Sequence, residues 1–468
     1  MFQESTIAAI ATGLTDSGIG IVRISGWDAI NVGNRLFRTP SGKSALKNAE
    51  SHVMKYGVVI DENGNVIDEV MAVVMKAPKS FTGEDTVEIQ CHGGVLIMQK
   101  ILETSLKFGA RMAEPGEFTK RAFLNGRIDL SMAEAVMDVI QSRNEYALVS
   151  SVKQLRGNLA EAVKQMRAEI LYEIAFIEAA LDDPEHISLD GYPKELKEKV
   201  DHLIERISKL LDTADNGRIM KEGISTVILG KPNVGKSSLL NLLVGEDRAI
   251  VTDIAGTTRD ILEEHISLNG IGLNVIDTAG IRDTQDKVEK IGVERAKQYA
   301  KDADLIIYVA DSSVFLDEND REILSLISDK NAIILMNKSD LTSVVFEENL
   351  RALMAEDLPE RKDIPIIRIS VREHEGIDKF ENVVKEMFFQ GQLSQNSEII
   401  ITNLRHKEAL QNTYESLLLV RQSIENCMEE DFYSIDLMNA YTSLGYIIGE
   451  EVSDDLVEEI FSKFCMGK

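Results

Sequence analysis

The sequence predicts a multidomain α+β protein: a small N-terminal α/β domain, a central helical bundle, and an α/β domain inserted into that bundle. The order of patterns along the chain predicts this. Strand and helix patterns alternate up to about residue 126, helical periodicity follows, and the same periodicity returns after residue 398. Between the two helical blocks, buried-strand patterns alternate with helical segments. The length of 468 residues suits roughly three domains.

Composition restricts the function classes. The 51 Lys and Arg against 78 Asp and Glu give 51 − 78 = −27, so the surface as a whole repels nucleic acid. An RNA role would therefore need a local basic patch or a partner protein. Cys91, Cys427 and Cys465 are too few and scattered for a disulfide framework or a zinc cluster. Neither a signal peptide nor a run of about 20 apolar residues is seen, so we expect a cytoplasmic protein without a membrane span.

The N-terminal domain is expected at 1–125. Its predicted strands are 18–25, 53–60, 69–76 and 85–91, and its predicted helices are 27–37 and 95–108. Two polar stretches, 81–85 and 115–121, have the composition of loops. Such loops often bind ligands but are as often ordinary solvated turns, and the residues alone leave both readings open.

Helical periodicity begins at about Ser131. One stripe is predicted to lie on a single helix: Leu155, Leu159, Val163, Met166, Ile170, Ile174, Ile177 and Leu181. Asp182-Asp183-Pro184 is expected to end this helix. A second apolar stripe runs from Leu196 to Leu211. Such stripes are far more often bundle core than catalytic. Because helical patterns resume beyond the linker at 391–398, we expect one helical domain (126–220 and 391–468) interrupted by residues 221–390.

The inserted segment has the pattern of a mostly parallel sheet. Asn269-Gly270 is a strong hairpin signal between two of its strands. A closing helix is expected at 377–389. The predicted strands are 224–229, 261–268, 273–276, 305–309, 332–336 and 364–369.

The first of these strands leads into Gly230-Lys231-Pro232-Asn233-Val234-Gly235-Lys236-Ser237, which fits G-x-x-x-x-G-K-[ST]. Backbone N–H groups without bulky side chains and a helix N-terminus form a cavity for phosphate oxygens. Lys236 is expected to reach the β- and γ-phosphates, and Ser237 to hold Mg²⁺. A strand before the octet and a helix after it supply the required context.

Two further motifs identify the nucleotide. Asp277-Thr278-Ala279-Gly280 ends a strand, which puts a carboxylate beside Mg²⁺ and a glycine N–H near the γ-phosphate. Asn337-Lys338-Ser339-Asp340 follows another, and an Asp there accepts two hydrogen bonds that guanine can donate and adenine cannot. These motifs predict GTP in a P-loop (Ras-like) domain. The residues expected to bind it are Asn233, Val234, Gly235, Lys236, Ser237, Ser238, Thr252, Asp253, Ile254, Ala255, Gly256, Thr257, Thr258, Asp277, Thr278, Ala279, Gly280, Asn337, Lys338 and Asp340.

The motifs together resemble a known family. GKPNVGKSS, TDIAGTTRD, DTAGIR and NKSD look like translation-factor-related GTPases. RISG, FTGED, HGG, PGEFTKRAFLNGRIDL and the terminal FCMGK resemble the MnmE (TrmE) family of tRNA uridine-modification GTPases. The likeness covers the N-terminal domain, the inserted domain and the last residues.

The resemblance implies a hydrolytic mechanism. Ile281 stands where many small GTPases have the Gln that orients water, so another acid is required. The family's catalytic Glu corresponds to Glu289, which on the residues alone reads as one more exposed acid. Mg²⁺ is expected on Ser237 and Thr258. The resemblance further implies a K⁺ ion, which neutralises charge in the transition state as an arginine finger does. Its implied ligands are Asn233, Thr252, Ile254 and Thr257.

For the N-terminal domain, the resemblance implies dimerisation and a 5-formyl-tetrahydrofolate or related one-carbon donor. Arg23 and Lys468 suit the carboxylates of its glutamyl tail, while Glu88 suits donor groups on the pterin. Arg127 is the fourth implied contact, and on sequence alone Glu88 and Arg127 read first as surface charges. Cys465 corresponds to the family's C-terminal Cys, with its role open. Residues 13–17 depart from the family's Pro-Pro-Gly-rich loop. The resemblance also places Ser370 and Val371 in the GTP site near the guanine, where Ser-Ala is usual in the family.

The family's activity gives the expected function: K⁺-stimulated GTP hydrolysis coupled to C5 aminomethyl or carboxymethylaminomethyl modification of the wobble uridine, position 34, of tRNA. The implied partners are a second copy of the chain and an FAD-dependent protein of the MnmG (GidA) type, in a heterotetramer or larger. The alternative is a regulatory GTPase switch in ribosome assembly. That class shares the nucleotide motifs but would need an RNA-binding module in place of a folate domain.

Overall fold

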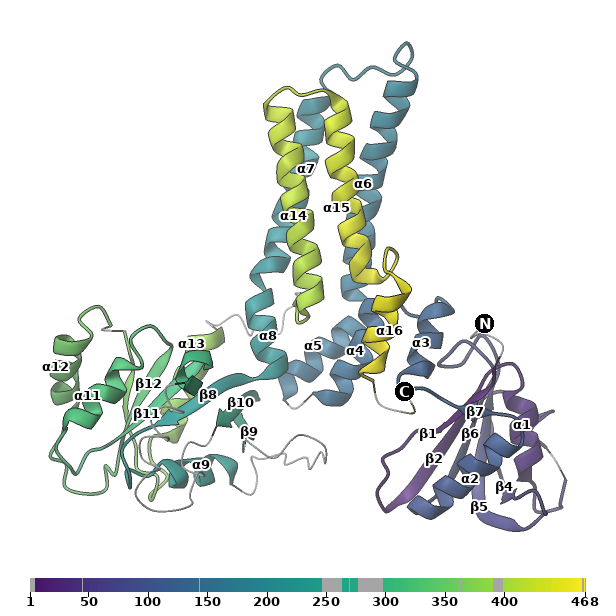
Figure 1. Cartoon of the computed structure of the whole chain (residues 1–468), viewed down its shortest axis with the longest axis horizontal. Helices are drawn as coiled ribbons and strands as arrows, with labels where there is room; N and C mark the ends of the chain where they lie inside the picture. Colours follow the sequence, from purple (N-terminus) through teal and green to yellow (C-terminus); the bar gives the residue numbers. More distant parts are fainter. Residues whose placement is uncertain are drawn as a thin grey trace. The chain divides into compact units, whose positions relative to one another are not determined.

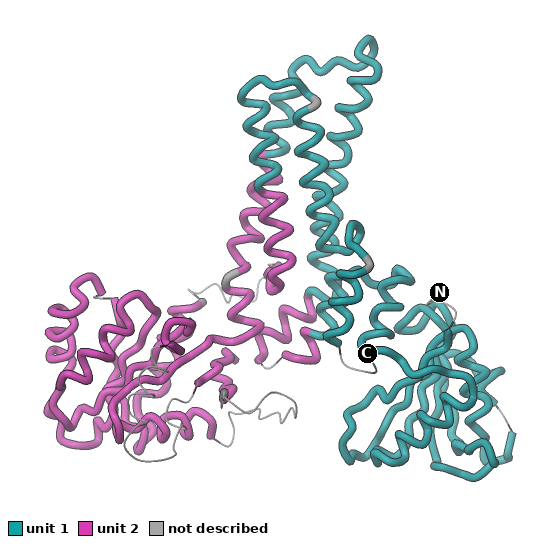
Figure 2. The backbone as a smooth tube through the Cα atoms, in the orientation of Figure 1, with its two compact units in different colours: residues 1–137, 154–200, 415–468 teal, residues 138–153, 201–414 magenta. Residues whose placement is uncertain are grey.

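The computed structural model describes residues 5–43, 45–142, 144–245, 263–268, 270–276, 298–361, 363–389, 399–464 and 467. The chain forms two compact units (Figure 2). Unit 1 comprises residues 1–137, 154–200 and 415–468, and unit 2 comprises residues 138–153 and 201–414. Within the described residues, no helix combines the length and the apolar character that crossing a membrane requires.

A seven-stranded sheet forms the N-terminal domain (Figure 1). Its order is β3-β4-β5-β6-β2-β1-β7. β7 pairs with β1 in parallel, and the other pairs are antiparallel. The strands are β1 (Ile7–Ile10), β2 (Ser17–Ser25), β3 (Phe37–Arg38), β4 (Met54–Ile60), β5 (Val66–Met75), β6 (Thr86–Gly93) and β7 (Arg111–Met112).

Alternating burial explains why these residues form strands. Val22, Ile24, Val87 and Ile89 point to one face, which packs with α1 (Ala29–Leu36) and α2 (Val95–Lys107) into a single core. The four predicted strands and both helices are confirmed, with ends shifted by a few residues. β1, β3 and β7 escaped prediction because two to four residues are too few to show a period.

The helical segments are mostly as expected, with one correction. The apolar stripe that starts at Leu155 does not lie on one helix: Leu155 ends one helix, and the next begins at Asn158. Gly157, in the left-handed region at φ 86°, separates them. The helices are α3 (Glu117–Leu124), α4 (Leu130–Gln141), α5 (Glu145–Leu155), α6 (Asn158–Asp182), α7 (Tyr192–Asp212), α8 (Ala214–Glu222), α14 (Leu404–Glu425), α15 (Glu430–Ile448) and α16 (Asp454–Ser462).

In unit 1, α6 packs along α15. Ser434 Oγ donates to Glu178 Oε1 over 2.7 Å, and Arg167 lies over the ring of Tyr441. These two helices flank the α/β segment in sequence, which supports an inserted domain. The compact units do not divide the chain at the predicted boundaries. Unit 2 also contains the end of α4, most of α5, all of α8 and parts of α7 and α14 (Figure 2). The boundaries at 125, 220 and 390 therefore stay predictions.

Unit 2 contains a six-stranded sheet of order β13-β12-β11-β8-β10-β9. β9 and β10 form the predicted antiparallel hairpin, and the other pairs are parallel. Asn269 of the predicted turn lies outside the described residues. The elements are β8 (Ile224–Leu229), β9 (Glu263–Leu268), β10 (Ile271–Ile276), β11 (Leu305–Asp311), β12 (Ala332–Asn337), β13 (Ile366–Arg368), α9 (Lys236–Val244), α11 (Glu318–Ser325), α12 (Glu347–Asp357) and α13 (Ile377–Phe389).

The central strands of this sheet are buried on both faces. Every residue of β11 and β12 is buried, with Ile307 and Val309 in one core and Ile306 and Tyr308 in the other. This explains their unbroken apolar sequence. β13 is shorter than the predicted 364–369. The carboxyl ends of β8 and β12 carry the P-loop and the Asn337–Asp340 turn.

Candidate functional site: a P-loop and a guanine-type turn

Glycines determine the path of the loop between β8 and α9. Gly230 has φ 155°, and a Cβ on it would lie 2.5 Å from the Val309 carbonyl oxygen. Gly235 has φ 105°, and its Cβ would lie 2.3 Å from Nδ2 of Asn337. Side chains at either position would both strain the backbone and collide with a neighbouring strand end. The two glycines of the motif are therefore required by the packing of the loop itself.

The loop presents backbone and side-chain groups at the start of α9. Lys236 Nζ donates to the carbonyl oxygens of Gly230 (2.7 Å) and Lys231 (2.8 Å), which holds the ammonium group over the loop. Ser237 is exposed in the first helical turn, so its hydroxyl can reach a metal ion. Asn233 is exposed and has φ 63°, a conformation that Asn tolerates better than most residues. Its amide oxygen suits a hard cation such as K⁺.

Asn337 joins three of the predicted nucleotide segments. The side chain is buried, and its Nδ2 donates to the Val234 carbonyl oxygen over 2.8 Å. Its Oδ1 accepts from the Val371 N–H over 3.1 Å. The P-loop, the Asn337-Asp340 turn and the Ser370-Val371 turn are thus brought together as the sequence predicted. Asn337 acts here as a connecting group rather than as an exposed ligand.

Asp340 is exposed beside this connection. The Ser370 hydroxyl donates to Asp340 Oδ1 over 2.7 Å, and the Glu373 N–H donates to the same hydroxyl over 3.1 Å. These bonds orient a carboxylate at the edge of the site. A carboxylate in this position can accept two hydrogen bonds from one planar donor pair, as the guanine prediction requires.

Much of the predicted hydrolytic machinery lies outside the described residues. This applies to Thr252–Thr258, to Asp277–Gly280 and to Glu289. Mg²⁺ binding by Thr258, K⁺ binding by Thr252, Ile254 and Thr257, and the catalytic role of Glu289 therefore stay predictions. In the part of the chain that is described, no three His, Cys, Asp or Glu side chains gather to hold a metal ion. Of the predicted metal ligands, Ser237 and Asn233 are described, and they offer a hydroxyl and an amide oxygen.

A second group of predicted residues meets in the N-terminal domain. Arg23 and Glu88 are partners across β2 and β6, and Arg23 Nε lies 2.8 Å from Glu88 Oε1. Arg23 Nη1 also donates to the carbonyl oxygen of Gly467 over 3.3 Å, which brings the chain's end to the sheet. The sequence assigned Arg23 and Glu88 to different parts of a ligand. The structure instead pairs them, because residues opposite each other on neighbouring strands lie within contact distance.

Aromatic rings flank this ion pair. The Arg23 guanidinium lies 5.5 Å from the ring centroid of Phe118 and 5.9 Å from that of Phe81. Arg127 lies 5.6 Å from the Phe81 centroid and donates to the Ser80 carbonyl. Three of the four predicted folate contacts therefore share one region. Lys468 and Cys465 lie outside the described residues.

A buried ion-pair network supports that region, and the sequence did not predict it. Arg121 is 6% exposed and contacts Glu117 Oε1 at 2.9 Å and Glu84 Oε2 at 3.1 Å. Arg111 adds a second cation to Glu117. Burial by itself would raise the pKa of Glu117, but hydrogen bonds from Arg111, Glu114 N–H and Arg121 outweigh it and hold that pKa below its usual value.

This network joins the two polar stretches at 81–85 and 115–121. Ser25 connects them to the sheet, since its hydroxyl bonds with Thr82 Oγ1 (2.8 Å) and donates to Glu84 Oε2 (3.0 Å). They are therefore not simple solvated turns. The signal available in the sequence was the pair of opposite charges, Glu84 and Arg121, in two loops that both read as polar.

Two family models match the chain. The model described as the MnmE helical domain matches residues 130–465, and the model described as the N-terminus of the GTP-binding protein TrmE matches residues 6–127. The first spans well over half of the 468 residues and includes the inserted α/β segment.

The chain belongs to the MnmE family of tRNA modification GTPases. The tRNA modification GTPase MnmE of Lachnoclostridium phytofermentans is 57% identical over 466 residues, and the protein of that name from Clostridioides difficile is 47% identical over 468. Each match covers 100% of both chains. The family bears out the predicted fold class and the prediction of a GTPase in tRNA modification. A solved structure of an Aquifex aeolicus Era variant bound to GDP·AlF4⁻ is 28% identical, covering 42% of this chain and 67% of that one, with a TM-score of 0.28.

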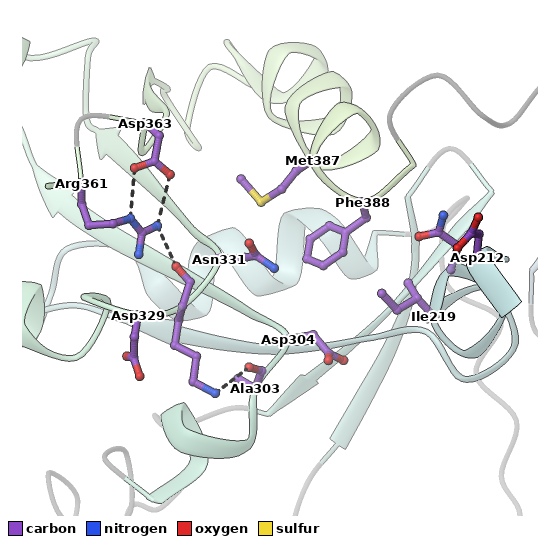
Figure 3. Close-up of a pocket in the computed structure, with 12 residues that line it drawn as sticks. Asp212, Ile219, Ala303, Asp304, Asp329, Asn331, Arg361, Asp363, Met387 and Phe388 are labelled. Carbon is purple, nitrogen blue, oxygen red and sulfur yellow. Dashed lines mark hydrogen bonds and ion pairs between the residues drawn. The ribbon is translucent and has the colours of Figure 1, made fainter. Parts of the chain in front are cut away.

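A separate pocket of about 800 Å³ in unit 2 contains none of the predicted nucleotide residues. Arg361 and Lys330, which line it, contact a neighbouring carboxylate and the backbone (Figure 3). Arg361 Nε lies 3.0 Å from Asp363 Oδ1, Arg361 Nη2 donates to the Lys330 carbonyl over 2.9 Å, and Lys330 Nζ donates to the Ala303 carbonyl over 3.5 Å. These contacts hold loops at the amino ends of β11 and β12.

Proposed function

We propose that this MnmE-family GTPase binds GTP with Mg²⁺ and hydrolyses it with stimulation by K⁺. The observation that carries the proposal is the connection made by Asn337, which joins Val234 of the P-loop to Val371 beside the exposed carboxylate of Asp340. One joined surface then carries both a phosphate end, Lys236 with the N–H groups of the loop, and a guanine end.

Each residue of this site has a task. The loop amides and Lys236 bind the phosphates, Ser237 with Thr258 holds Mg²⁺, and Asp340 accepts from guanine. Mg²⁺ supplies charge neutralisation on the phosphate oxygens. Asn233, with Thr252, Ile254 and Thr257, would hold K⁺, and Glu289 would orient the attacking water because Ile281 has no polar group.

Hydrolysis measured in KCl and in NaCl tests the cation. We expect turnover at least about tenfold faster in K⁺, the size of effect that one added charge on a transition state readily produces. Asn233→Ala should abolish the difference while Asn331→Ala, an exposed Asn of the same domain, should keep it. Equal rates in Na⁺, or K⁺ stimulation that survives Asn233→Ala, would exclude this cation mechanism.

We further propose that the N-terminal domain binds 5-formyl-tetrahydrofolate or a related folate through Arg23, Glu88, Arg127 and Lys468, and that the protein dimerises through this domain. The support is the cluster of Arg23, Glu88 and Arg127 with Phe81, where rings and charges lie side by side. A planar ring system with a carboxylate tail matches such a surface chemically. Binding of 5-formyl-tetrahydrofolate to the full chain, measured by calorimetry, tests this part.

The reaction we propose is C5 aminomethyl or carboxymethylaminomethyl modification of the wobble uridine of tRNA, carried out with an FAD-dependent partner of the MnmG type. With a net charge of −27, the chain is expected to leave most of the RNA-binding surface to that partner. A ribosome-assembly switch is less favoured, because the chain has a TrmE-type N-terminal domain.

Genetic complementation decides the overall reaction. In a strain lacking this gene, the modified nucleoside should disappear from tRNA digests, and the wild-type gene should restore it whereas Glu289→Ala should not. Unchanged tRNA in the deletion strain would refute the proposed function. Copurification of a flavoprotein from native lysate tests the partner separately.

A further inference from the structure

The guanine-type turn is held by an ion pair that the nucleotide motifs do not include. Lys338 Nζ lies 2.6 Å from Oδ2 of Asp311, whose side chain is 7% exposed. Asp311 ends β11, and it pairs in register with Asn337 at the end of β12. The carboxylate therefore stands beside the turn that carries Asn337 and Lys338.

Asp311 is itself fixed. Its Oδ1 accepts from the Ser313 N–H over 2.9 Å and from the Ser313 hydroxyl over 2.6 Å. Burial by itself would raise the pKa of Asp311, but hydrogen bonds from Lys338 and Ser313 hold that pKa below its usual value. The group is consequently a charged carboxylate at neutral pH, with one oxygen given to Ser313 and the other to Lys338.

The turn needs such support because its backbone is strained. Lys338 has φ 62°, a conformation that residues with a Cβ rarely adopt. The Ser312 hydroxyl donates to the Lys338 carbonyl oxygen over 3.2 Å, and the Ser312 N–H donates to that of Asn337 over 3.0 Å. Residues 311–313 therefore contact both the backbone and the side chain of the turn.

Both lysines of the site have their ammonium groups held. Lys236 donates to two backbone carbonyl oxygens of the P-loop, and Lys338 faces the carboxylate of Asp311. A lysine paired with a carboxylate has its ammonium group anchored and its long aliphatic stem available for packing against a ring. Lys338 is therefore suited to contact a base.

We propose that Asp311 is a positioning residue for nucleotide binding: it anchors the ammonium group of Lys338 and so orders the guanine-binding turn. The inference rests on the proposed GTP site and adds to it a residue outside the P-loop and the NKSD motif. Lys338 then contributes to nucleotide affinity mainly when Asp311 is charged.

Asp311→Asn tests the charge alone, since Asn keeps an acceptor for Ser313. Titration of the full chain with fluorescent GDP should show about tenfold weaker binding, and Lys338→Met should cost about as much. Because both changes remove one shared interaction, the double variant should bind no more than about threefold more weakly than either single variant. The ratio of GTP to GDP affinity should stay at the wild-type value, because the phosphate end is untouched.

Unchanged GDP affinity in Asp311→Asn would overturn the inference. It would also be overturned if the double variant bound GDP about a hundredfold more weakly than wild type, because the two residues would then act independently. Asp357→Asn is the matched control, because it breaks the ion pair of Asp357 with Arg321 (2.7 Å) in α12 of the same unit, and it should bind GDP normally. If Asp311→Asn does not fold, Asp311→Glu replaces it, with binding weakened about threefold expected and wild-type affinity overturning the inference. A wild-type chain that binds GDP no better than ADP would instead refute the proposed function.

Discussion

The two candidate sites hold their polar groups in different ways. At the P-loop, Gly230 and Gly235 determine the path of the backbone, and the contacts of Lys236 Nζ include two backbone carbonyl oxygens. In the N-terminal domain, charged side chains pair with one another, as Arg23 does with Glu88 and Arg121 with Glu117. A ligand at the first site meets a cradle of backbone N–H groups. A ligand at the second must compete with, or add to, ion pairs that already exist.

This difference determines how each site should fail. Backbone cradles are sensitive to changes of shape, because a single Cβ closes them. Ion-pair networks are sensitive to loss of one charge, because the remaining partner is left buried and uncompensated. Variants that remove a charge from the N-terminal site, or add a methyl group to the P-loop, therefore test whether the two sites differ in this way.

The largest effect is expected for Arg121→Ala. It removes the described cation of Glu84 and one of the two cations on Glu117, which keeps Arg111, and should destabilise the N-terminal domain by about 3 kcal/mol. Denaturant unfolding followed by near-UV circular dichroism measures it, and GDP binding should be retained. Arg35→Ala is the control, because Arg35 is 51% exposed and its ion pair with Asp28 spans 3.7 Å. Loss of less than about 1 kcal/mol in Arg121→Ala, the worth of a surface pair, would show that the network is not a buried one.

Gly235→Ala should have the next largest effect. The new Cβ would lie 2.3 Å from Asn337 Nδ2, at a φ of 105° that Ala rarely adopts. Because Asn337 connects the P-loop to the guanine turn, we expect GTP affinity to fall about a hundredfold, close to 3 kcal/mol. Gly245→Ala is the control, since its φ is not in the left-handed region and its nearest contact would be 3.2 Å. Normal GTP binding by Gly235→Ala would mean that the loop adapts and that shape does not control this site.

The same difference explains how much the sequence could predict. The P-loop consists of eight consecutive residues that must meet specific backbone requirements. Gly230 and Gly235 meet two of them, so the conformation of the loop can be predicted from the sequence. The strands of the parallel sheet are equally evident, because burial on both faces leaves an apolar run. Even there, the pairing of Asp311 with Lys338 was missed, since it joins two strand ends 27 positions apart.

The N-terminal site is non-local throughout. Arg23 and Glu88 lie 65 positions apart, and Gly467 is 444 positions from Arg23. No period or spacing connects such residues, so only resemblance to the family singled them out. The break between α5 and α6 at Gly157 is a case where a local pattern misleads. The apolar stripe continues across Gly157, but the left-handed conformation of this glycine separates the two helices. Side-chain pattern records which face is buried, and backbone conformation decides where a helix stops.

A smaller effect is expected on folate binding by the N-terminal site. Arg23→Ala should weaken 5-formyl-tetrahydrofolate binding about tenfold, because a cation for the tail carboxylate is lost and Glu88 is left unpaired. Calorimetry on Arg23→Ala, Glu88→Ala and the double variant separates these causes. If Arg23 binds the ligand, the double variant stays weak. Recovery of wild-type affinity in the double variant would assign Arg23 a purely structural role.

The smallest effect is a pH dependence of the N-terminal domain. The pKa of Glu117 lies below its usual 4.5, because the hydrogen bonds from Arg111, Glu114 N–H and Arg121 outweigh its burial. Its charged form is therefore favoured in the folded state, and the stabilisation it gives is present above pH 4.5 and is lost as pH falls through the folded pKa. Glu117→Gln does not titrate, so the gap in unfolding free energy between wild type and this variant should be constant from pH 7 to about pH 5 and should shrink as the pH falls further. A gap independent of pH would mean that Glu117 acts through packing alone, and the contrast between a charge-built and a backbone-built site would then rest on Arg121.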